Sequence, residues 1–138
     1  MKICVSADSG SLDARIDPRF GRCRYFVIVD SETMEFEAIS NMASEAMSGA
    51  GIQAAQTVAK NLAKVVITGN VGPNAFKVLS TAGIRIVTGA SGTVKEAVER
   101  YKRGELKEIS RPTVGGHFGV GRPGRMGTER GRRGRGRR

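Results

Sequence analysis

Three pairs of closely spaced glycines are the residues of this sequence best suited to contact a ligand. The pairs are Gly49 and Gly51, Gly69 and Gly72, and Gly89 and Gly92. Each pair precedes a segment with helical periodicity, and glycine lets the backbone approach a bulky ligand and adopt positive φ. The first N–H groups of a helix, together with the helix dipole, favour an anion. We therefore expect an anion-binding site where these loops meet.

The long loop at residues 8–24, here called the first loop, adds cationic side chains beside the same site. It contains Arg15, Arg19, Arg22, Cys23 and Arg24. None of the glycine loops has the P-loop pattern GxxxxGK[ST] or the dinucleotide pattern GxGxxG. A single glycine before a helix is commonly a turn residue, and loop arginines commonly form a solvated face. The convergence of the loops is therefore what favours a site.

Hydrophobic periodicity predicts the elements that position these loops. Alternating or β-branched runs indicate strands at 2–7, 25–30, 35–40, 64–68 and 84–88. A first helix is indicated by apolar residues at helical spacing, namely Ile52, Ala55, Ala59 and Leu62. The predicted order of the five strands and three helices is therefore βββαβαβα.

The second and third helices carry their own start and stop signals. Pro73 opens the second helix and Gly83 ends it. Thr93 and Glu96 form a capping-box pattern for the third helix, which Gly104 ends. The expected buried faces are Phe76, Leu79 and Ala82 in the second helix, and Val94, Ala97, Val98 and Tyr101 in the third.

This order of elements restricts the fold. Helix-separated strands pair in parallel through right-handed crossovers, whereas the first three strands suit an antiparallel meander. We predict an α/β fold with a ribonuclease H-like mixed five-stranded sheet, strand order 3-2-1-4-5 and strand 2 antiparallel. The loops after strands 1, 3, 4 and 5 then share one edge, where open α/β sheets bind ligands.

Charge divides the 138 residues into two parts. Residues 1–110 carry 14 Lys and Arg against 12 Asp and Glu, whereas residues 111–138 carry nine Arg against one Glu. The second part also has nine glycines and no hydrophobic periodicity, so it cannot bury enough apolar surface to offset its ordering entropy. We predict one domain at residues 1–110 and a disordered Arg/Gly-rich tail at residues 111–138.

The two cysteines and the N-terminal residues indicate the cellular compartment in which the protein is expected. Cys4 and Cys23 stand outside any CxxC or other metal-ligand spacing, and Cys4 lies within an apolar run. Charged residues interrupt the N-terminus, and no apolar run approaches the ~20 residues that span a membrane. We expect a cytoplasmic protein with reduced thiols, no signal peptide and no membrane association.

Four motifs follow one another along the predicted loops and helix starts. They are FGRxxYF at 20–26, GAGIQAAQ at 49–56, GNxGPNAF at 69–76 and GTVxEA at 92–97. In this order they resemble the dinitrogenase iron–molybdenum cofactor-biosynthesis family, of the NifX and NifB C-terminal type. The resemblance covers residues 1 to about 108. It implies a ribonuclease H-like fold without nuclease activity.

The resemblance also implies a function and a set of site residues. Such a protein would be a non-enzymatic accessory in nitrogen fixation that binds or carries iron–molybdenum cofactor, or an iron–sulfur precursor cluster, between donor and acceptor proteins. The implied binding residues are Arg19, Gly21, Arg22, Cys23, Gly49, Gly51, Gly69, Asn70, Gly72, Asn74, Gly92 and Thr93. Many members have His in place of Arg19, and some end in His- or Met-rich tails. Here only His117 and Met126 represent those types in the tail.

Cys23 is the one thiol expected near this site. Helix N-termini and arginines would bind the periphery of an anionic cluster, and a thiolate could take an exposed iron. Arg22 and Arg24 flank Cys23 and should lower the pKa of its thiol. An ordinary loop cysteine is the alternative interpretation.

Nucleic-acid binding through the tail is a second hypothesis. Closely spaced arginines neutralise phosphates and release counterions, which gives sequence-independent and salt-sensitive affinity. The arginines in question are Arg130, Arg132, Arg133, Arg135, Arg137 and Arg138. Base stacking would have only Phe118 available.

An enzyme and a ligand-free scaffold are two further hypotheses. Nuclease chemistry needs clustered carboxylates that hold two metal ions. Asp8 lies where one carboxylate would belong, but the helical segments 52–62 and 73–82 contain no acid. A Ser or Cys nucleophile would need a histidine as its general base, and the lone His117 lies in the tail. We therefore expect no enzymatic activity, and the sequence leaves the scaffold open.

Overall fold

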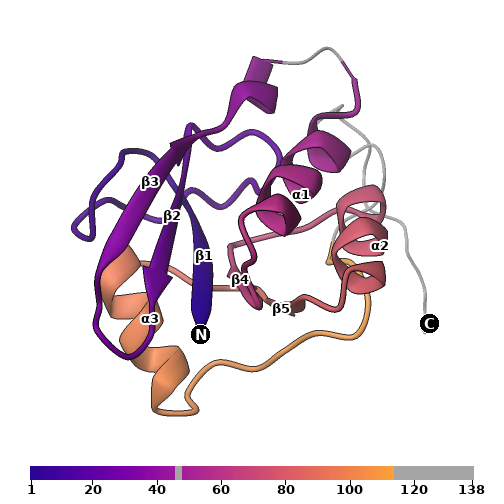
Figure 1. Cartoon of the computed structure of the whole chain (residues 1–138). Coiled ribbons are helices and arrows are strands. Elements are labelled where there is room, and N and C mark those ends of the chain that lie inside the picture. Colours follow the sequence, from indigo (N-terminus) through magenta and orange to yellow (C-terminus); the bar gives the residue numbers. More distant parts are fainter. Residues whose placement is uncertain (46–47, 114–138) are drawn as a thin grey trace.

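A mixed sheet with helices on both faces is built from residues 1–45 and 48–113, which the computed structural model describes (Figure 1). The strands are β1 (Lys2–Ala7), β2 (Tyr25–Asp30), β3 (Phe36–Ser40), β4 (Val65–Ile67) and β5 (Arg85–Val87). The helices are the 3-10 helix η1 (Met42–Glu45), then α1 (Ala50–Lys60), α2 (Pro73–Thr81) and α3 (Val94–Lys102). The five strands and three α-helices match the sequence prediction, whereas η1 was not predicted.

The strand order is β3-β2-β1-β4-β5, which confirms the predicted topology. The central strand β1 pairs antiparallel with β2 and parallel with β4, so that Cys4 lies between Ile28 and Val66. The outer pairs are antiparallel for β2 and β3 and parallel for β4 and β5. The carboxyl ends of β1, β4 and β5 therefore lie at one edge of the sheet, here called the carboxyl edge.

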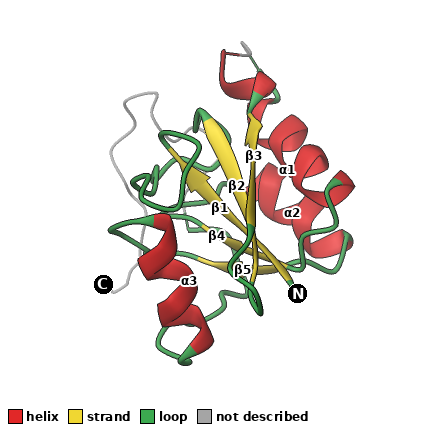
Figure 2. Ribbon diagram, turned by 60° about the vertical axis from the view of Figure 1, so that its left-hand side comes forward, coloured by secondary structure: helices red, strands yellow, loops and turns green. Residues whose placement is uncertain are grey.

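Side chains alternate along β1 between two cores. Cys4 lies in the core beneath α1 and α2, with Leu79 of α2. Ile3 lies in the core on the opposite face, with Val98 of α3. Figures 1 and 2 show this division, with α1 and α2 on one face of the sheet and α3 on the other. Because β1 and β4 are covered on both faces, the apolar residues are consecutive at Ile3–Val5 of β1 and throughout β4.

The C-terminal ends of α1 and α2 differ from the prediction. The periodicity places Leu62 and Ala82 on buried helix faces, but both side chains are exposed. Leu62 exposes 70% of its surface and has φ of 65°, because α1 ends at Lys60. The Asn61 side chain donates a hydrogen bond to the Thr57 carbonyl at 2.8 Å and caps the helix. Apolar spacing alone does not detect such a cap.

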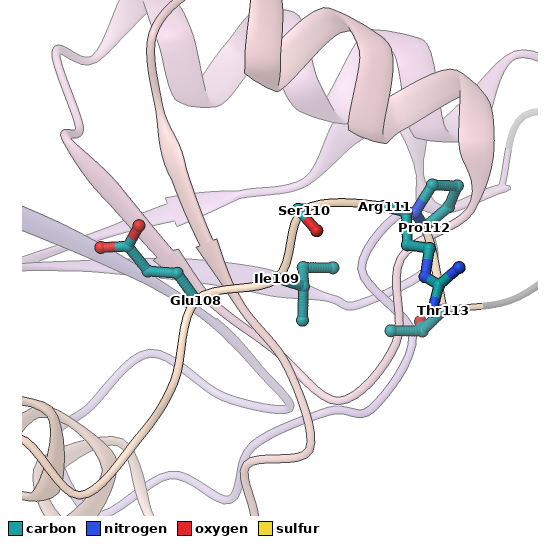
Figure 3. A pocket seen from close by; sticks show the side chains of 6 residues that line it. All are labelled: Glu108, Ile109, Ser110, Arg111, Pro112 and Thr113. Atoms are coloured by element: carbon teal, nitrogen blue, oxygen red, sulfur yellow. The ribbon is translucent and has the colours of Figure 1, made fainter.

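Residues 105–113 form a strap that leaves α3 and covers the free edge of β5. Ile109 N donates to Ile86 O at 2.8 Å, and Glu108 forms an antiparallel bridge with Val87. A surface pocket is lined by the strap residues from Glu108 to Thr113 (Figure 3). Residues 111–113, which the sequence assigns to the tail, are thus part of this ordered strap. The rest of the predicted tail, residues 114–138, lies outside the described residues.

We expect the strap to belong to the cooperative folding unit. Ile109 packs against the core beneath α1 and α2 while remaining half-exposed. Replacing Ile109 by Ala should lower the free energy of unfolding by about 1–2 kcal/mol, less than for a fully buried isoleucine. Urea denaturation measures the change, with the exposed Lys107→Ala as control. Equal midpoints for the two variants would show that the strap contributes nothing to stability.

Candidate functional site

The first loop is joined by backbone hydrogen bonds to the carboxyl edge of the sheet. Asp17 N donates to Ser6 O in β1 at 3.0 Å, and Asn70 N donates to Pro18 O at 2.8 Å just after β4. The approach is closest at Gly69, where an added Cβ would lie 2.6 Å from Pro18 Cα. The glycine therefore makes room for the first loop, and the Asn70 N–H group is already paired. Neither Gly69 nor Asn70 N is available to a ligand.

The buried hydroxyl of Ser6 helps to hold the first loop against the carboxyl edge of the sheet. The Ser6 hydroxyl lies 2.7 Å from both Asp17 O and the Thr68 hydroxyl. The buried Asp17 carboxylate accepts from Arg19 N at 2.9 Å and pairs with the Arg19 guanidinium at 3.3 Å. Hydrogen bonding and charge from Asp17 raise the pKa of Arg19. The charge of Arg19 is thus already compensated by a buried carboxylate.

The start of α3 is closed by the first loop. Val94 N donates to Ala14 O and Lys95 N donates to Leu12 O, both at 2.9 Å. Thr93 and Glu96 form the predicted capping box, with bonds of 2.9 and 3.2 Å. Hydrogen bonding from Thr93 to the Glu96 carboxylate lowers the pKa of Glu96. The first N–H groups of α3 are therefore paired.

This pairing corrects the prediction for the third glycine loop. Gly92 and Thr93 were expected to present N–H groups to an anion, but the helix that follows them has none to offer. Gly92 instead adopts φ of 91°, and a Cβ there would lie 2.5 Å from Glu96 Oε1. Glycine at this position serves the capping box and the sharp turn into α3.

The starts of α1 and α2 differ from that of α3, because they lie side by side and lack the hydrogen bonds from the first loop that close α3. A Cβ on Gly51 would lie 3.3 Å from Ala75 Cβ, and one on Gly21 would lie 3.0 Å from Gly51 N. Neither helix has a side-chain cap or an acidic residue in its first turn. The first-turn N–H groups of Ala50, Gly51, Ile52, Asn74 and Ala75 donate no hydrogen bond to another described residue. We call this arrangement the paired helix starts.

Asn41 holds the first loop against the segment that leads to α1, a role that sequence reasoning missed. Its buried side chain donates to Gly21 O at 3.1 Å and to Cys23 O at 2.8 Å. Its Oδ1 accepts from Ala43 N and so opens η1. An asparagine directly after an alternating strand was the available signal, since Asn commonly bonds nearby backbone. Arg22 of the first loop also contacts the segment that leads to α1, because its guanidinium donates to Ser44 O at 3.2 Å.

Cys23 does not have the environment predicted for a metal-binding thiolate. Its side chain is fully buried, and Sγ donates to Phe20 O at 3.3 Å. Burial, followed by the charge of Asp17, raises the pKa of the thiol to about 12. The expected lowering by Arg22 and Arg24 is therefore wrong, because both are exposed and desolvation of the sulfur dominates. Cys23 is a core thiol in this fold.

Carboxylates are missing from a long stretch around the paired helix starts. Residues 46–95, which include α1, β4, α2 and β5, contain no Asp or Glu. Within residues 1–45 and 48–113, no three His, Cys, Asp or Glu side chains gather as a metal-ion site would require. The paired helix starts thus offer hydrogen-bond donors within a stretch of sequence that has no acidic residue, and no side-chain metal cage is found among the described residues.

Two sets of predicted residues cannot be placed. His117, Met126 and the tail arginines from Arg130 to Arg138 lie outside the described residues. Nucleic-acid binding by those arginines stays a prediction from sequence. No helix in the described ranges combines the length and apolar character that crossing a membrane requires.

We expect Cys23 to react with iodoacetamide only when the protein unfolds. With a pKa of about 12, roughly one thiol in ten thousand is ionised near pH 8. Mass spectrometry of the Cys4→Ala variant isolates Cys23, and the same variant in urea serves as the reactive control. Rapid labelling of the folded variant would mean that the thiol is accessible after all.

Comparisons with known proteins agree with this architecture. A chain of the orange protein from Desulfovibrio gigas, solved in its apo form, is 42% identical with a TM-score of 0.80, covering 82% of this chain and 96% of that one. A NifB-like protein of Thermotoga is 29% identical with a TM-score of 0.72, covering 82% and 97%. An uncharacterised protein of Methanocaldococcus jannaschii is 32% identical over 112 residues, covering 79% and 92%.

A sequence model of one family extends over nearly the whole ordered domain. The family is described as dinitrogenase iron–molybdenum cofactor, and the match spans residues 1–104. That span includes all four motifs at the carboxyl edge, together with every strand and helix of the structure. This chain therefore belongs to the dinitrogenase iron–molybdenum cofactor family.

Proposed function

We propose that this protein is a small accessory protein that holds an anionic metallocluster at the paired helix starts. The observation that carries the proposal is the adjacency of two open helix N-termini, in contact through Gly51 and Ala75. Each start favours negative charge through its N–H groups and its dipole, and two together favour a bulky polyanion. The cargo would be an iron–molybdenum cofactor or an iron–sulfur precursor of it.

The donor set fits the periphery of such a cluster rather than its metal ions. Backbone N–H groups donate hydrogen bonds to sulfide or oxo groups, and they do not ligate iron. Cys23, the predicted thiolate, is buried and protonated. The residues that fit contact with a cargo are Gly21, Arg22, Gly49, Gly51, Gly72 and Asn74. Binding without protein ligands to the metal suits a carrier, because release then breaks no metal–protein bond.

Family membership supports the class of cargo. The family name refers to the iron–molybdenum cofactor, and the orange protein has an apo form, that is, a form without its bound group. For a carrier, proteins that donate and accept the cluster are the expected partners. The absence of acids from residues 46–95 agrees with an anionic cargo on this side of the molecule.

We expect the purified protein to retain about one cluster per chain in anaerobic titration with a synthetic iron–sulfur cluster or a nitrogenase cofactor precursor. Asn74→Asp places a carboxylate at the second position of α2, beside the open N–H groups. Repulsion of about 1.4 kcal/mol would weaken binding roughly tenfold. Ultraviolet–visible and paramagnetic resonance spectra report the bound fraction.

Lys95→Gln is the matched control. It changes the net charge by the same amount at the second position of α3, whose first N–H groups are already paired with the first loop. This variant should bind as the parent does. Equal weakening in both variants would indicate a general charge effect, and no retention by the parent protein would reject the proposal.

A further inference from the structure

We propose that two copies of this chain associate through the outer edge of β3, which joins their two five-stranded sheets into one. β3 is the outer strand at the end of the sheet opposite to β5 (Figure 1). The strap pairs with the edge of β5, whereas no described segment pairs with the outer edge of β3. This association is independent of the proposed function, because it uses none of the residues of the paired helix starts.

The backbone groups that face outward on β3 follow from its pairing with β2. Asp30 N donates to Glu35 O at 2.8 Å, and Asn41 N donates to Arg24 O at 2.9 Å. Glu35 and Asn41 therefore direct their backbone groups toward β2, and the residues of an antiparallel strand alternate in this respect. The residues of β3 whose N–H and C=O groups point away from β2, without a described partner, are Phe36, Ala38 and Ser40.

One register lets a second copy pair with all of these groups. When Ala38 lies opposite Ala38 of the second copy, Phe36 lies opposite Ser40, and each of the three outward positions forms a hydrogen-bonded pair. This register has two-fold symmetry, so each copy supplies the strand that the other needs. A shift by two residues would instead place one outward residue opposite the turn at Met34, which has φ of 64°, or opposite η1.

Apolar side chains are exposed around the same edge. Among the described residues, Phe36 of β3 exposes 45% of its surface, and Met42, two residues after β3, exposes 89%. Ile39 is half-buried and packs against the core beneath α1 and α2. In the register centred on Ala38, Ile39 forms a close pair with Glu37 of the second copy, whose methylene groups cover it. Association thus removes apolar surface from water.

Charge complementarity favours the same register. Glu35 lies opposite Asn41 of the second copy, and Asn41 in turn lies opposite Arg24 in the pairing of β3 with β2. Because directly opposed residues share a face of the sheet, the exposed Arg24 side chain can reach the Glu35 carboxylate of the second copy. Neither side chain forms an ion pair with another described residue. The acidic edge therefore meets a cation and a neutral residue.

The predicted dimer is weak and leaves both candidate sites accessible. An interface centred on one strand of five residues is small, and we expect a dissociation constant on the order of 10–100 micromolar. β3 runs toward the carboxyl edge of the sheet, and antiparallel pairing points the two carboxyl edges in opposite directions. The paired helix starts of the two copies thus lie at opposite ends of the joined sheet.

Sedimentation velocity of the full chain between about 5 and about 500 micromolar tests the association. Ala38→Pro removes the central N–H donor of the interface, and the isolated chain loses no bond of its own ladder, because this N–H group faces away from β2. The variant should stay monomeric throughout the range. Leu62→Ser, which replaces an exposed apolar residue outside β3, is the control and should associate as the parent does.

A charge exchange tests the register and does not depend on the proline. Arg24→Glu places two carboxylates where the ion pair would form, and it should weaken association about tenfold. Combining it with Glu35→Arg restores opposite charges and should recover most of the affinity. If Ala38→Pro fails to fold by circular dichroism, these two variants decide the question.

Hydrogen exchange of the amides gives a readout of the strand itself. The N–H groups of Phe36, Ala38 and Ser40 should exchange rapidly in dilute protein and become protected as the concentration rises. Those of Glu37 and Ile39 face β2 and should be protected at both concentrations.

Three results would overturn the proposal. The first is a parent protein that stays monomeric up to about 500 micromolar. The second is association that persists unchanged in both Ala38→Pro and Arg24→Glu, since the interface would then lie elsewhere. The third is protection of the edge amides in dilute protein only after addition of an extract that lacks this chain, which would assign the edge of β3 to a different protein.

Discussion

The backbone of the first loop, joined to the carboxyl edge of the sheet, is the constraint on which the rest of the site depends. Asp17 bonds to β1, Pro18 accepts from the segment after β4, and Ile16 N donates to Gly92 O after β5 at 2.9 Å. Ordinary peptide hydrogen bonds thus tie one irregular segment to three strands. This can occur only because Gly69 has no Cβ to oppose Pro18.

The path of that loop divides three similar helix starts into two kinds. Where the loop passes α3, its carbonyl groups take the N–H groups that a ligand would need. At α1 and α2 it presents Gly21 instead, close against Gly51, and leaves the first turns open. Asn41 maintains this contrast, because its side chain binds the carbonyls of Gly21 and Cys23 from within the fold.

The same arrangement explains the behaviour of the charged and titratable groups. Asp17 is buried beneath the loop and compensates Arg19, and its charge also disfavours ionisation of the Cys23 thiol. The loop thereby removes a cation and a thiolate from the groups that could contact a ligand. What remains is the backbone donors of the paired helix starts, within a stretch of sequence that has no acidic residue, and these donors suit an anion held by hydrogen bonds.

The sequence by itself determined the strand order, the capping box at Thr93 and Glu96, and the concentration of net positive charge in residues 111–138, because periodicity, caps and composition are local properties. Only the tertiary structure decided which glycine loops stay open, that Cys23 is protonated, and that residues 111–113 join the domain. Each of these depends on partners distant in sequence. Val94 N donates a hydrogen bond to Ala14 O, and Thr113 N donates one to Val71 O. No local pattern predicts which carbonyl will lie within 3 Å of a given N–H group.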